Sequence, residues 1–432
     1  MRKNFIQQLN LSLRRRFQKH FHTTNTKRYL VSTFWLTLSK FLGMGISLAS
    51  TLYITRALGP QNFGELSYAQ SIIGILGFLN ALTSSQILYR DLVKSPEKEK
   101  TLLGTAWSLS FVVSILTTSI ILLYTFIKPH DTLTTQVISI LALAQLFSSF
   151  LMVQNTFYAK TETKLISIFQ FSLHFSVSLA KIIAMVMGHG VLILASIMFL
   201  EQLVAATVYL LLYYRSSKIS PFTWRFDKSY AKTLLLDSLP MVIVTSSAAI
   251  SARIDQVMIR EYLDITTVGL YHAAVQLTEI WQYIPGLILA GIFPAIVNAK
   301  TASRDTYRKR LLALGFLFFI YGSLASLFTI YLAPKLISLI YSDAFLASVP
   351  YLKVYAWSIT GTIIGFLVST FLITENHRKL QIAMGVIPML LNVILNYLWI
   401  PKYGAEGAAW ATVISYTITP LLPLVVLRFR GK

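Results

Sequence analysis

Long apolar segments recur along the chain, and short polar segments separate them. Segments such as 111–127 and 311–332 are apolar on every side rather than along one stripe, which is typical of helices surrounded by lipid or protein. As a helix, each segment is long enough to cross about 30 Å of hydrocarbon. The strands of a membrane β-barrel would instead be about 10 residues long and strictly alternating. The pattern therefore predicts an all-α polytopic membrane protein.

About twelve transmembrane helices are expected. They lie at 30–56, 64–89, 101–128, 133–158, 166–187, 190–214, 233–258, 267–297, 311–333, 347–374, 380–400 and 404–427. A long polar connection separates the sixth from the seventh. The expected organisation is a basic cytoplasmic arm at 1–29, a first six-helix bundle at 30–214, a cytoplasmic linker at 215–232, a second six-helix bundle at 233–428 and a cytoplasmic tail at 429–432.

Composition agrees with this assignment. Of the 432 residues, 55% are hydrophobic and only 13% are charged, whereas a soluble domain has about 25% charged residues. A single soluble core also stops growing at about 250–300 residues, so the apolar surplus is too large for one interior. The chain has no cysteine, which excludes disulfides and thiolate metal sites.

The positive charges orient the predicted helices. Of the 38 Lys and Arg residues, 29 fall in the two ends and in alternate connections, five fall in the opposite connections and four fall within helices. Basic residues collect on the cytoplasmic side of membrane proteins, so an even number of helices with both termini in the cytoplasm is expected. The net charge of +21 then reflects topology and attraction to anionic lipid headgroups, and we expect no nucleic-acid partner.

The N-terminal arm has two interpretations. Phe5, Leu9, Leu13 and Phe17 fall near helical spacing among Arg and Lys, as in an amphipathic helix that lies on a membrane surface. A basic, partly disordered tail fits the same residues. The arm lacks the apolar core and cleavage site of a signal peptide.

The two halves share a repeated pattern. At one constant offset of 205, three residues that follow the first helix match three that follow the seventh: Leu58, Gly64 and Ala69 with Leu263, Gly269 and Ala274. The match predicts a duplicated six-helix unit, and two such units can rock about a central cavity in alternating access. Gly59-Pro60 predicts a sharp turn, and Gly64 and Gly269 are expected to start a helix or to allow close backbone approach.

Three segments resemble a known family. They are Thr55-Arg-Ala-Leu-Gly-Pro-Gln-Asn-Phe-Gly64, Arg253-Ile-Asp-Gln256 with Val268-Gly-Leu-Tyr-His-Ala-Ala274, and Ile400-Pro-Lys-Tyr-Gly-Ala-Glu-Gly-Ala-Ala409. In this order they are similar to the polysaccharide-biosynthesis flippases (Wzx-type), whose superfamily includes MATE drug exporters and peptidoglycan-precursor flippases. The resemblance covers nearly the whole chain after residue 30.

The resemblance implies a fold and a cargo. The fold would be a MATE-like, V-shaped pair of six-helix bundles in the bacterial cell (inner) membrane. The cargo would be an undecaprenyl-pyrophosphate-linked oligosaccharide, moved from the cytoplasmic to the exterior leaflet for assembly of O-antigen, capsule or exopolysaccharide. Partners would be this lipid-linked oligosaccharide, membrane lipids, a polysaccharide polymerase and glycosyltransferases. The alternative is an ion-coupled multidrug or small-solute antiporter of the MATE class. Peptidoglycan-precursor flippases typically have fourteen helices, so a count of twelve argues against that branch.

Cations within the predicted helices are candidates for binding the pyrophosphate. An ionisable residue in a membrane helix is costly and is a functional candidate by default, and charged donors bind phosphate strongly. Lys40, Arg253 and Lys181 are assigned this role. The alternatives are that Lys40 snorkels to the cytoplasmic surface, that Arg253 forms a structural interhelical pair, and that Lys181 pairs with Glu201 of the next helix.

The remaining polar residues suggest ion coupling and a polar cavity. Glu279 and Asp255 are candidates for carrying H⁺ or binding Na⁺, and Asp255 is equally a structural candidate. His174, His272 and Gln276 lie on polar stripes of otherwise apolar helices and are candidate cavity-lining residues. The alternative for both stripes is a seam of interhelical hydrogen bonds.

Signatures of enzymes are missing. The chain contains no P-loop and no H-E-x-x-H motif, and no acidic pair of a glycosyltransferase lies in a sizeable loop. We therefore expect no catalytic residue, no metal ligand and no cofactor, and a membrane-embedded transferase is the third hypothesis. Without an ATP site, an ion gradient or removal of the product would drive transport. Four intramembrane cations against three anions favour an anionic cargo over the organic cations of a MATE exporter.

Overall fold

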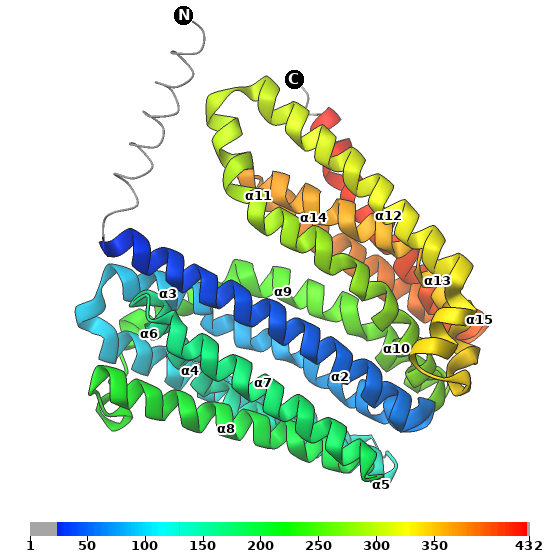
Figure 1. Cartoon of the computed structure of the whole chain (residues 1–432), viewed down its shortest axis with the longest axis horizontal. Helices are drawn as coiled ribbons and strands as arrows, with labels where there is room; N and C mark the ends of the chain where they lie inside the picture. The colour runs from blue at the N-terminus through cyan, green and yellow to red at the C-terminus, as the bar shows by residue number, and fades with distance from the viewer. Residues whose placement is uncertain (1–23, 129, 430–432) are drawn as a thin grey trace, which may run out of the picture.

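The computed structural model describes residues 24–128 and 130–429, without the side chains of 24–34, 36, 37, 40 and 424–429 (Figure 1). Within those ranges every regular element is a helix, which confirms the predicted all-α class. The apolar pattern of the predicted amphipathic arm, Phe5 to Phe17, lies outside the described residues.

The first half of the chain forms ten helical elements. In order they are α2 (Thr24–Leu76), η1 (Gly77–Thr83), α3 (Ser85–Lys94), η2 (Pro96–Lys98), α4 (Glu99–Ile127), α5 (Thr132–Ala144), η3 (Gln145–Val153), α6 (Gln154–Ala159), α7 (Thr163–Val186) and α8 (Val191–Ser217), where η denotes a 3₁₀ helix.

The connection 218–227, which contains η4, leads from α8 to the second half. The elements after α8 are η4 (Pro221–Thr223), α9 (Lys228–Tyr262), α10 (Ile265–Glu279), η5 (Ile280–Gln282), α11 (Tyr283–Ala302), α12 (Arg304–Ile340), η6 (Asp343–Ser348), α13 (Val349–Tyr355), α14 (Ser358–Thr374) and α15 (Arg378–Phe429).

The chain is a multi-pass membrane protein. In the part that the structure describes, nine helices are long and apolar enough to cross a membrane, or ten if the bent pair α13–α14 is one span. Two of the nine consist of two helices joined at a glycine, because α2 is interrupted at Gly59 (φ 69°) and α15 at Gly404 (φ 61°). These left-handed conformations favour glycine, and the predicted turn at Gly59-Pro60 is confirmed. The count of twelve remains a prediction.

The predicted helix 267–297 lies within one candidate span, Ile265–Ala302, in which the 3₁₀ turn Ile280–Gln282 joins α10 to α11. Pro285 lies just beyond this turn and has no N–H to donate to the carbonyl of Trp281 four residues earlier. The hydroxyl of Tyr321 donates to that carbonyl instead, at 3.1 Å. A side chain of α12 therefore satisfies the backbone oxygen that the proline leaves free.

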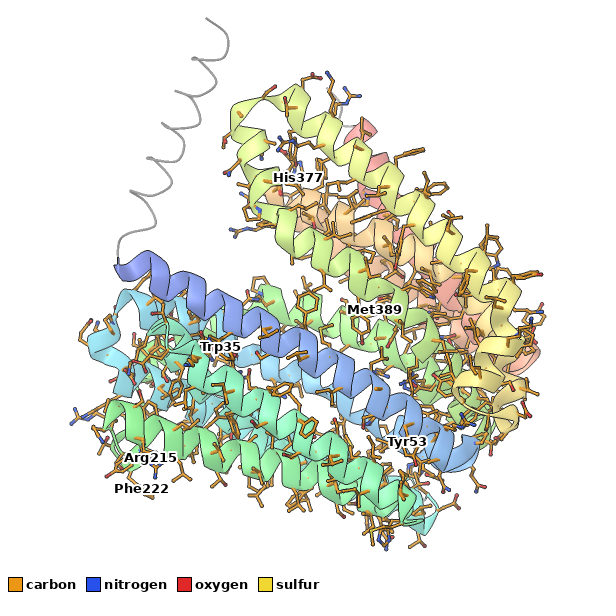
Figure 2. All side chains as sticks on the ribbon, viewed as in Figure 1. Trp35, Tyr53, Arg215, Phe222, His377 and Met389 are labelled. Atoms are coloured by element: carbon orange, nitrogen blue, oxygen red, sulfur yellow. The ribbon has the colours of Figure 1, made fainter. Side chains whose placement is uncertain are left out.

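The helices form two groups that meet at one end. Figure 1 shows that α2 converges with α10 and α12 at the end where their chain turns lie together, and that α2 diverges from α11 and α12 at the other end. α9 contacts both α2 and α15. Arg215 and His377, from connections predicted to be cytoplasmic, are labelled at the diverging ends, whereas Tyr53 lies towards the converging end (Figure 2).

A backbone contact between two glycines lies at the converging end. A Cβ added to Gly64 of α2 would overlap the carbonyl oxygen of Ile265, and a Cβ added to Gly269 of α10 would overlap that of Pro60. Ala69 and Ala274, the next matched residues of the repeat, are fully buried in the same cluster. Small residues let helix backbones approach closely in membranes, so the repeated glycines are where the two halves touch.

Replacing Gly64 with alanine should destabilise the protein, because the methyl group would meet backbone atoms that cannot rotate away. We expect Gly64→Ala to lower the free energy of unfolding by about 1–3 kcal/mol, the usual cost of overpacking. Thermal unfolding of the purified protein in detergent measures this. Gly45→Ala in the same helix is the control, since its Cβ would have no atom within 4 Å. Equal destabilisation by both variants would contradict the contact.

Candidate functional site

A small polar cavity lies between α2 and α7. It has a volume of about 290 Å³ and is lined by Ser39, Gly43, Met44, Ser47, Gln170, Phe171 and His174. The cavity thus brings Ser39 and Ser47 of the first predicted helix together with His174 of the fifth. Lys40 is adjacent in sequence to Ser39, but its side chain lies outside the described residues.

Lys181 and His174 share one carboxylate. Nζ of Lys181 lies 3.5 Å from one oxygen of Glu201, and Nδ1 of His174 lies 3.4 Å from the other. The side chains of Glu201 and Lys181 are only 16% and 20% exposed, whereas that of His174 is 55% exposed. The predicted pairing of Lys181 with Glu201 is confirmed. An anionic ligand would have to share Lys181 with Glu201 or displace it.

The carboxylate of Asp255 is buried, and each of its two oxygens accepts a hydrogen bond. The hydroxyl of Tyr271 donates to its Oδ2 at 2.6 Å, and the backbone N–H of Gln256 donates to its Oδ1 at 2.8 Å. The carbonyl oxygen of the Gln256 side chain in turn accepts from Ser71 of α2 at 2.6 Å. Hydrogen bonds between helices hold membrane proteins together. Both oxygens of Asp255 accept a hydrogen bond, and the one from Tyr271 links α9 to α10, which supports the structural interpretation of Asp255.

Arg253 lies two residues earlier and makes different contacts. Its side chain packs against α2, since a Cβ on Gly74 would lie 3.6 Å from its Cγ. Its Nη1 is buried, and among the described residues no acceptor bonds to it. Its charge interacts with those of Asp255 and Glu279, but neither is within ion-pair distance. A buried guanidinium N–H without a partner is costly.

The other residues of the second polar stripe lie between the halves. Gln276 accepts hydrogen bonds from Thr55 of α2 (3.4 Å) and Tyr341 (3.2 Å). His272 is buried with its ring centroid 5.3 Å from that of Phe63. Gln276 therefore belongs to an interhelical hydrogen-bond seam, the alternative interpretation of this stripe. Nδ1 of His272 is buried, and among the described residues no group bonds to it. Glu279, the last residue of α10, is half-buried and has no hydrogen bond or ion pair within the described ranges.

A group of charges that the sequence analysis did not pair links the halves at the converging end. Lys128, after α4, forms an ion pair with Glu261 of α9, and Asp131 lies 3.7 Å from Arg260. The hydroxyl of Tyr124 also donates to Glu261 at 3.3 Å. The sequence signal was present, because Lys128 and Arg260 were both assigned to exterior connections, but hydropathy does not pair charges that are distant in the chain.

His130 adds no positive charge to this group. Burial, and secondarily the charge of Arg260, lower the pKa of His130 below its ordinary value. The imidazole is therefore neutral at neutral pH and does not oppose the two cross-bundle pairs.

The chain matches the family model described as polysaccharide biosynthesis protein over residues 30–300. A curated relative, the probable flippase AglR of Haloferax volcanii, is 24% identical over 230 residues. That match covers 49% of this chain and 43% of the relative, so the chain spans less than half the length of this relative.

Solved structures share the fold. A multidrug resistance MATE family transporter of the MOP superfamily, inward-facing, overlaps with a TM-score of 0.70 at 12% identity, covering 89% of this chain and 93% of that one. The lipid II flippase MurJ in an inward closed conformation gives 0.68 at 15% identity, covering 92% and 87%. An outward-facing MATE family structure gives 0.59 at 15% identity, covering 92% and 95%. The described helices therefore overlap better with the inward-facing arrangement.

Reversing one charge of the Lys128–Glu261 pair should open the converging end. We expect Lys128→Glu to expose Ser67, which is fully buried in α2, and the double variant Lys128→Glu with Glu261→Lys to restore burial. Because the chain has no cysteine, Ser67→Cys labelling by a membrane-impermeant maleimide reports this directly.

The matched control is the pair Asp305–Lys309, which lies within one turn of α12 and links no other helix. Reversing Lys309 should leave labelling of residue 67 unchanged. Labelling that rises equally with both reversals, or that the double variant fails to lower, would contradict the role of the cross-bundle pair.

Proposed function

The chain belongs to the polysaccharide biosynthesis protein family, and we propose that it is a flippase that moves an undecaprenyl-pyrophosphate-linked oligosaccharide from the cytoplasmic to the exterior leaflet. The names of its relatives support this proposal, since one is a probable flippase and another flips lipid II. The product would serve assembly of a surface polysaccharide such as O-antigen, capsule or exopolysaccharide. The expected location is the bacterial inner membrane, with both ends of the chain in the cytoplasm.

The observation that carries the proposal is the unpartnered guanidinium of Arg253. It lies between α9 and α2, at the boundary of the two halves. A pyrophosphate that enters from the diverging, cytoplasmic ends would provide the acceptors that Arg253 lacks. Arginine suits this role because its planar fork can bind two phosphate oxygens at once.

The other candidate residues keep narrower roles. Lys181 would leave its ion pair with Glu201 and bind the sugar-phosphate head. His174 would line the neighbouring cavity. Lys40 of α2 is also proposed to bind the pyrophosphate. For coupling to H⁺ or Na⁺ we favour Glu279, which has no bonded partner among the described residues, over Asp255, whose two oxygens already accept hydrogen bonds.

Transport would proceed by alternating access. In the conformation observed, the glycine contact and the two cross-bundle ion pairs close the end predicted to be exterior. Opening that end requires these contacts to separate while the cytoplasmic ends approach each other. The polar head would pass between the halves and the lipid chain would remain in the bilayer. A polysaccharide polymerase and glycosyltransferases are the proposed partners before and after this step.

A MATE-class antiporter for organic cations is the second candidate. The structural overlap with a multidrug transporter favours it. An organic cation needs an acidic cavity, however, whereas the boundary between the halves presents Arg253 without a bound acceptor.

Reconstituted protein should flip the proposed cargo. In proteoliposomes containing a fluorescent undecaprenyl-pyrophosphate oligosaccharide, we expect the fraction of this lipid that is protected from an external quencher to change with time. In cells, we expect deletion of the gene to cause the lipid-linked unit to accumulate in the cytoplasmic leaflet. Protein-free vesicles and a fluorescent phosphatidylcholine are the controls. Normal surface polysaccharide in the deletion strain, together with altered drug sensitivity, would overturn the proposal in favour of the antiporter.

Variants of Arg253 and of Glu279 should affect cargo binding and ion coupling separately. We expect Arg253→Ala to lower the flipping rate at least about tenfold, the loss of roughly 1.4 kcal/mol of binding, without lowering the unfolding temperature, because a buried unpartnered charge is removed. Glu279→Gln should make the rate independent of the H⁺ or Na⁺ gradient. The exposed Lys353→Ala is the control. Normal transport by Arg253→Ala, or gradient dependence retained by Glu279→Gln, would remove the corresponding role.

A further inference from the structure

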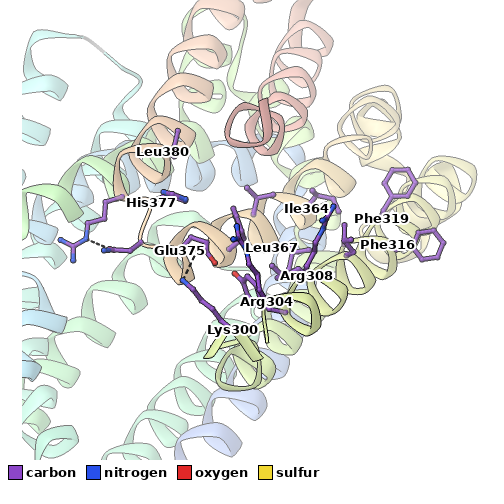
Figure 3. Close-up of a pocket in the computed structure, with 18 of the residues that line it drawn as sticks. Lys300, Arg304, Arg308, Phe316, Phe319, Ile364, Leu367, Glu375, His377 and Leu380 are labelled. Carbon is purple, nitrogen blue, oxygen red and sulfur yellow. Dashed lines mark hydrogen bonds and ion pairs between the residues drawn. The ribbon is translucent and has the colours of Figure 1, made fainter. Parts of the chain in front are cut away.

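A second, larger cavity lies away from the boundary between the halves. Its volume is about 1750 Å³, and it is lined by α12, α14, the end of α11 and the start of α15 (Figure 3). α14 packs against both α12 and α15, so it forms the floor of a groove whose two walls are α12 and the start of α15. All of its lining residues come from the second half of the chain.

One end of this groove is strongly basic. Five cations line it: Lys300, Arg304, Arg308, Arg378 and Lys379. The single acidic lining residue, Glu375, pairs with Lys300 at 3.2 Å. Within the described ranges Arg304, Arg308 and Lys379 form no ion pair. These residues belong to two connections predicted to be cytoplasmic, so the basic end lies at the level of the cytoplasmic lipid headgroups.

The other end of the groove is apolar and continues along α12 into the membrane span. Phe316 and Phe319 are 69% and 56% exposed, and Ile364 and Leu367 of α14 also line the groove (Figure 3). Gly315 adds no side chain to this wall of the groove. A Cβ built at Gly315 would have one neighbouring atom, in the side chain of Leu367 at 3.5 Å. The groove thus changes from cationic to apolar along its length.

The change from a cationic to an apolar lining indicates which kind of molecule the groove binds. A phosphate head with hydrocarbon chains matches cations at the membrane surface and an apolar groove within the membrane. A soluble anion would leave the apolar part unfilled. The chain's own N-terminal arm is basic and would be repelled. The cargo head must pass between the halves, whereas no residue of the first half lines this groove.

We propose that the groove between α12 and α15 binds one anionic glycerophospholipid of the cytoplasmic leaflet, with its phosphate on Arg304, Arg308 and Lys379 and an acyl chain along Phe316 and Phe319. The lipid joins the cytoplasmic ends of α12 and α15 and offsets their mutual repulsion. It is a structural ligand of the second half and is not the transported molecule.

Binding is measured on the purified full chain by native mass spectrometry and by thermal unfolding, with phosphatidylglycerol, phosphatidylcholine, undecaprenyl pyrophosphate and inorganic phosphate as separate probes. We expect one phosphatidylglycerol to bind and to raise the unfolding temperature. Phosphatidylcholine and inorganic phosphate should do neither. The double variant Arg304→Gln with Arg308→Gln should weaken phosphatidylglycerol binding about tenfold or more.

Two further variants make the result specific. Lys309→Gln with Arg310→Gln removes the same charge from the same turn of α12, but neither residue lines the groove, so binding should stay within about twofold of the unmodified protein. Gly315→Phe fills the groove and should weaken binding with every cation retained. Equal loss in both double variants, normal binding by Gly315→Phe, or binding of undecaprenyl pyrophosphate that Arg304→Gln with Arg308→Gln abolishes, would overturn the proposal.

Discussion

The backbone contact between Gly64 and Gly269 is the constraint on which the arrangement of the two halves depends. Lipid tails are as apolar as the side chains of the helices, so burial of apolar surface does little to bring membrane helices together. Close packing must do so, and only residues without a Cβ allow α2 and α10 to touch at this point. The contact keeps the helices together at one end and leaves the other ends free to diverge.

Polar side chains extend this contact towards the middle of the membrane. Ser71 donates to Gln256, and Thr55 donates to Gln276, each across the boundary between the halves. Every one of these groups would be costly in hydrocarbon without a partner, so together they specify how α2 lies against α9 and α10. Arg253 stands in the same boundary with an N–H that no described residue accepts.

Charge is distributed unequally between the two ends. At the converging end, Lys128 with Glu261 and Arg260 with Asp131 attract across the halves. At the diverging end, cations such as Arg304 and Arg308 outnumber acids and repel one another. The attraction across the halves at the converging end favours the observed conformation. The repulsion among the groove cations acts within the second half, between α12 and the start of α15.

The sequence by itself determined the helical class, the positions of most spans and the glycines of the repeat, because hydropathy and backbone freedom are properties of single residues and short segments. It also indicated the Lys181–Glu201 pair, since both residues lie on one helical hairpin. It did not determine that Gln276 bonds across to Thr55, that Lys128 reaches Glu261, or that cations of two separate connections line one groove. Only the tertiary structure decided these, because they depend on which helix faces meet, and in a membrane that choice is made by packing and hydrogen bonding between segments far apart in the chain.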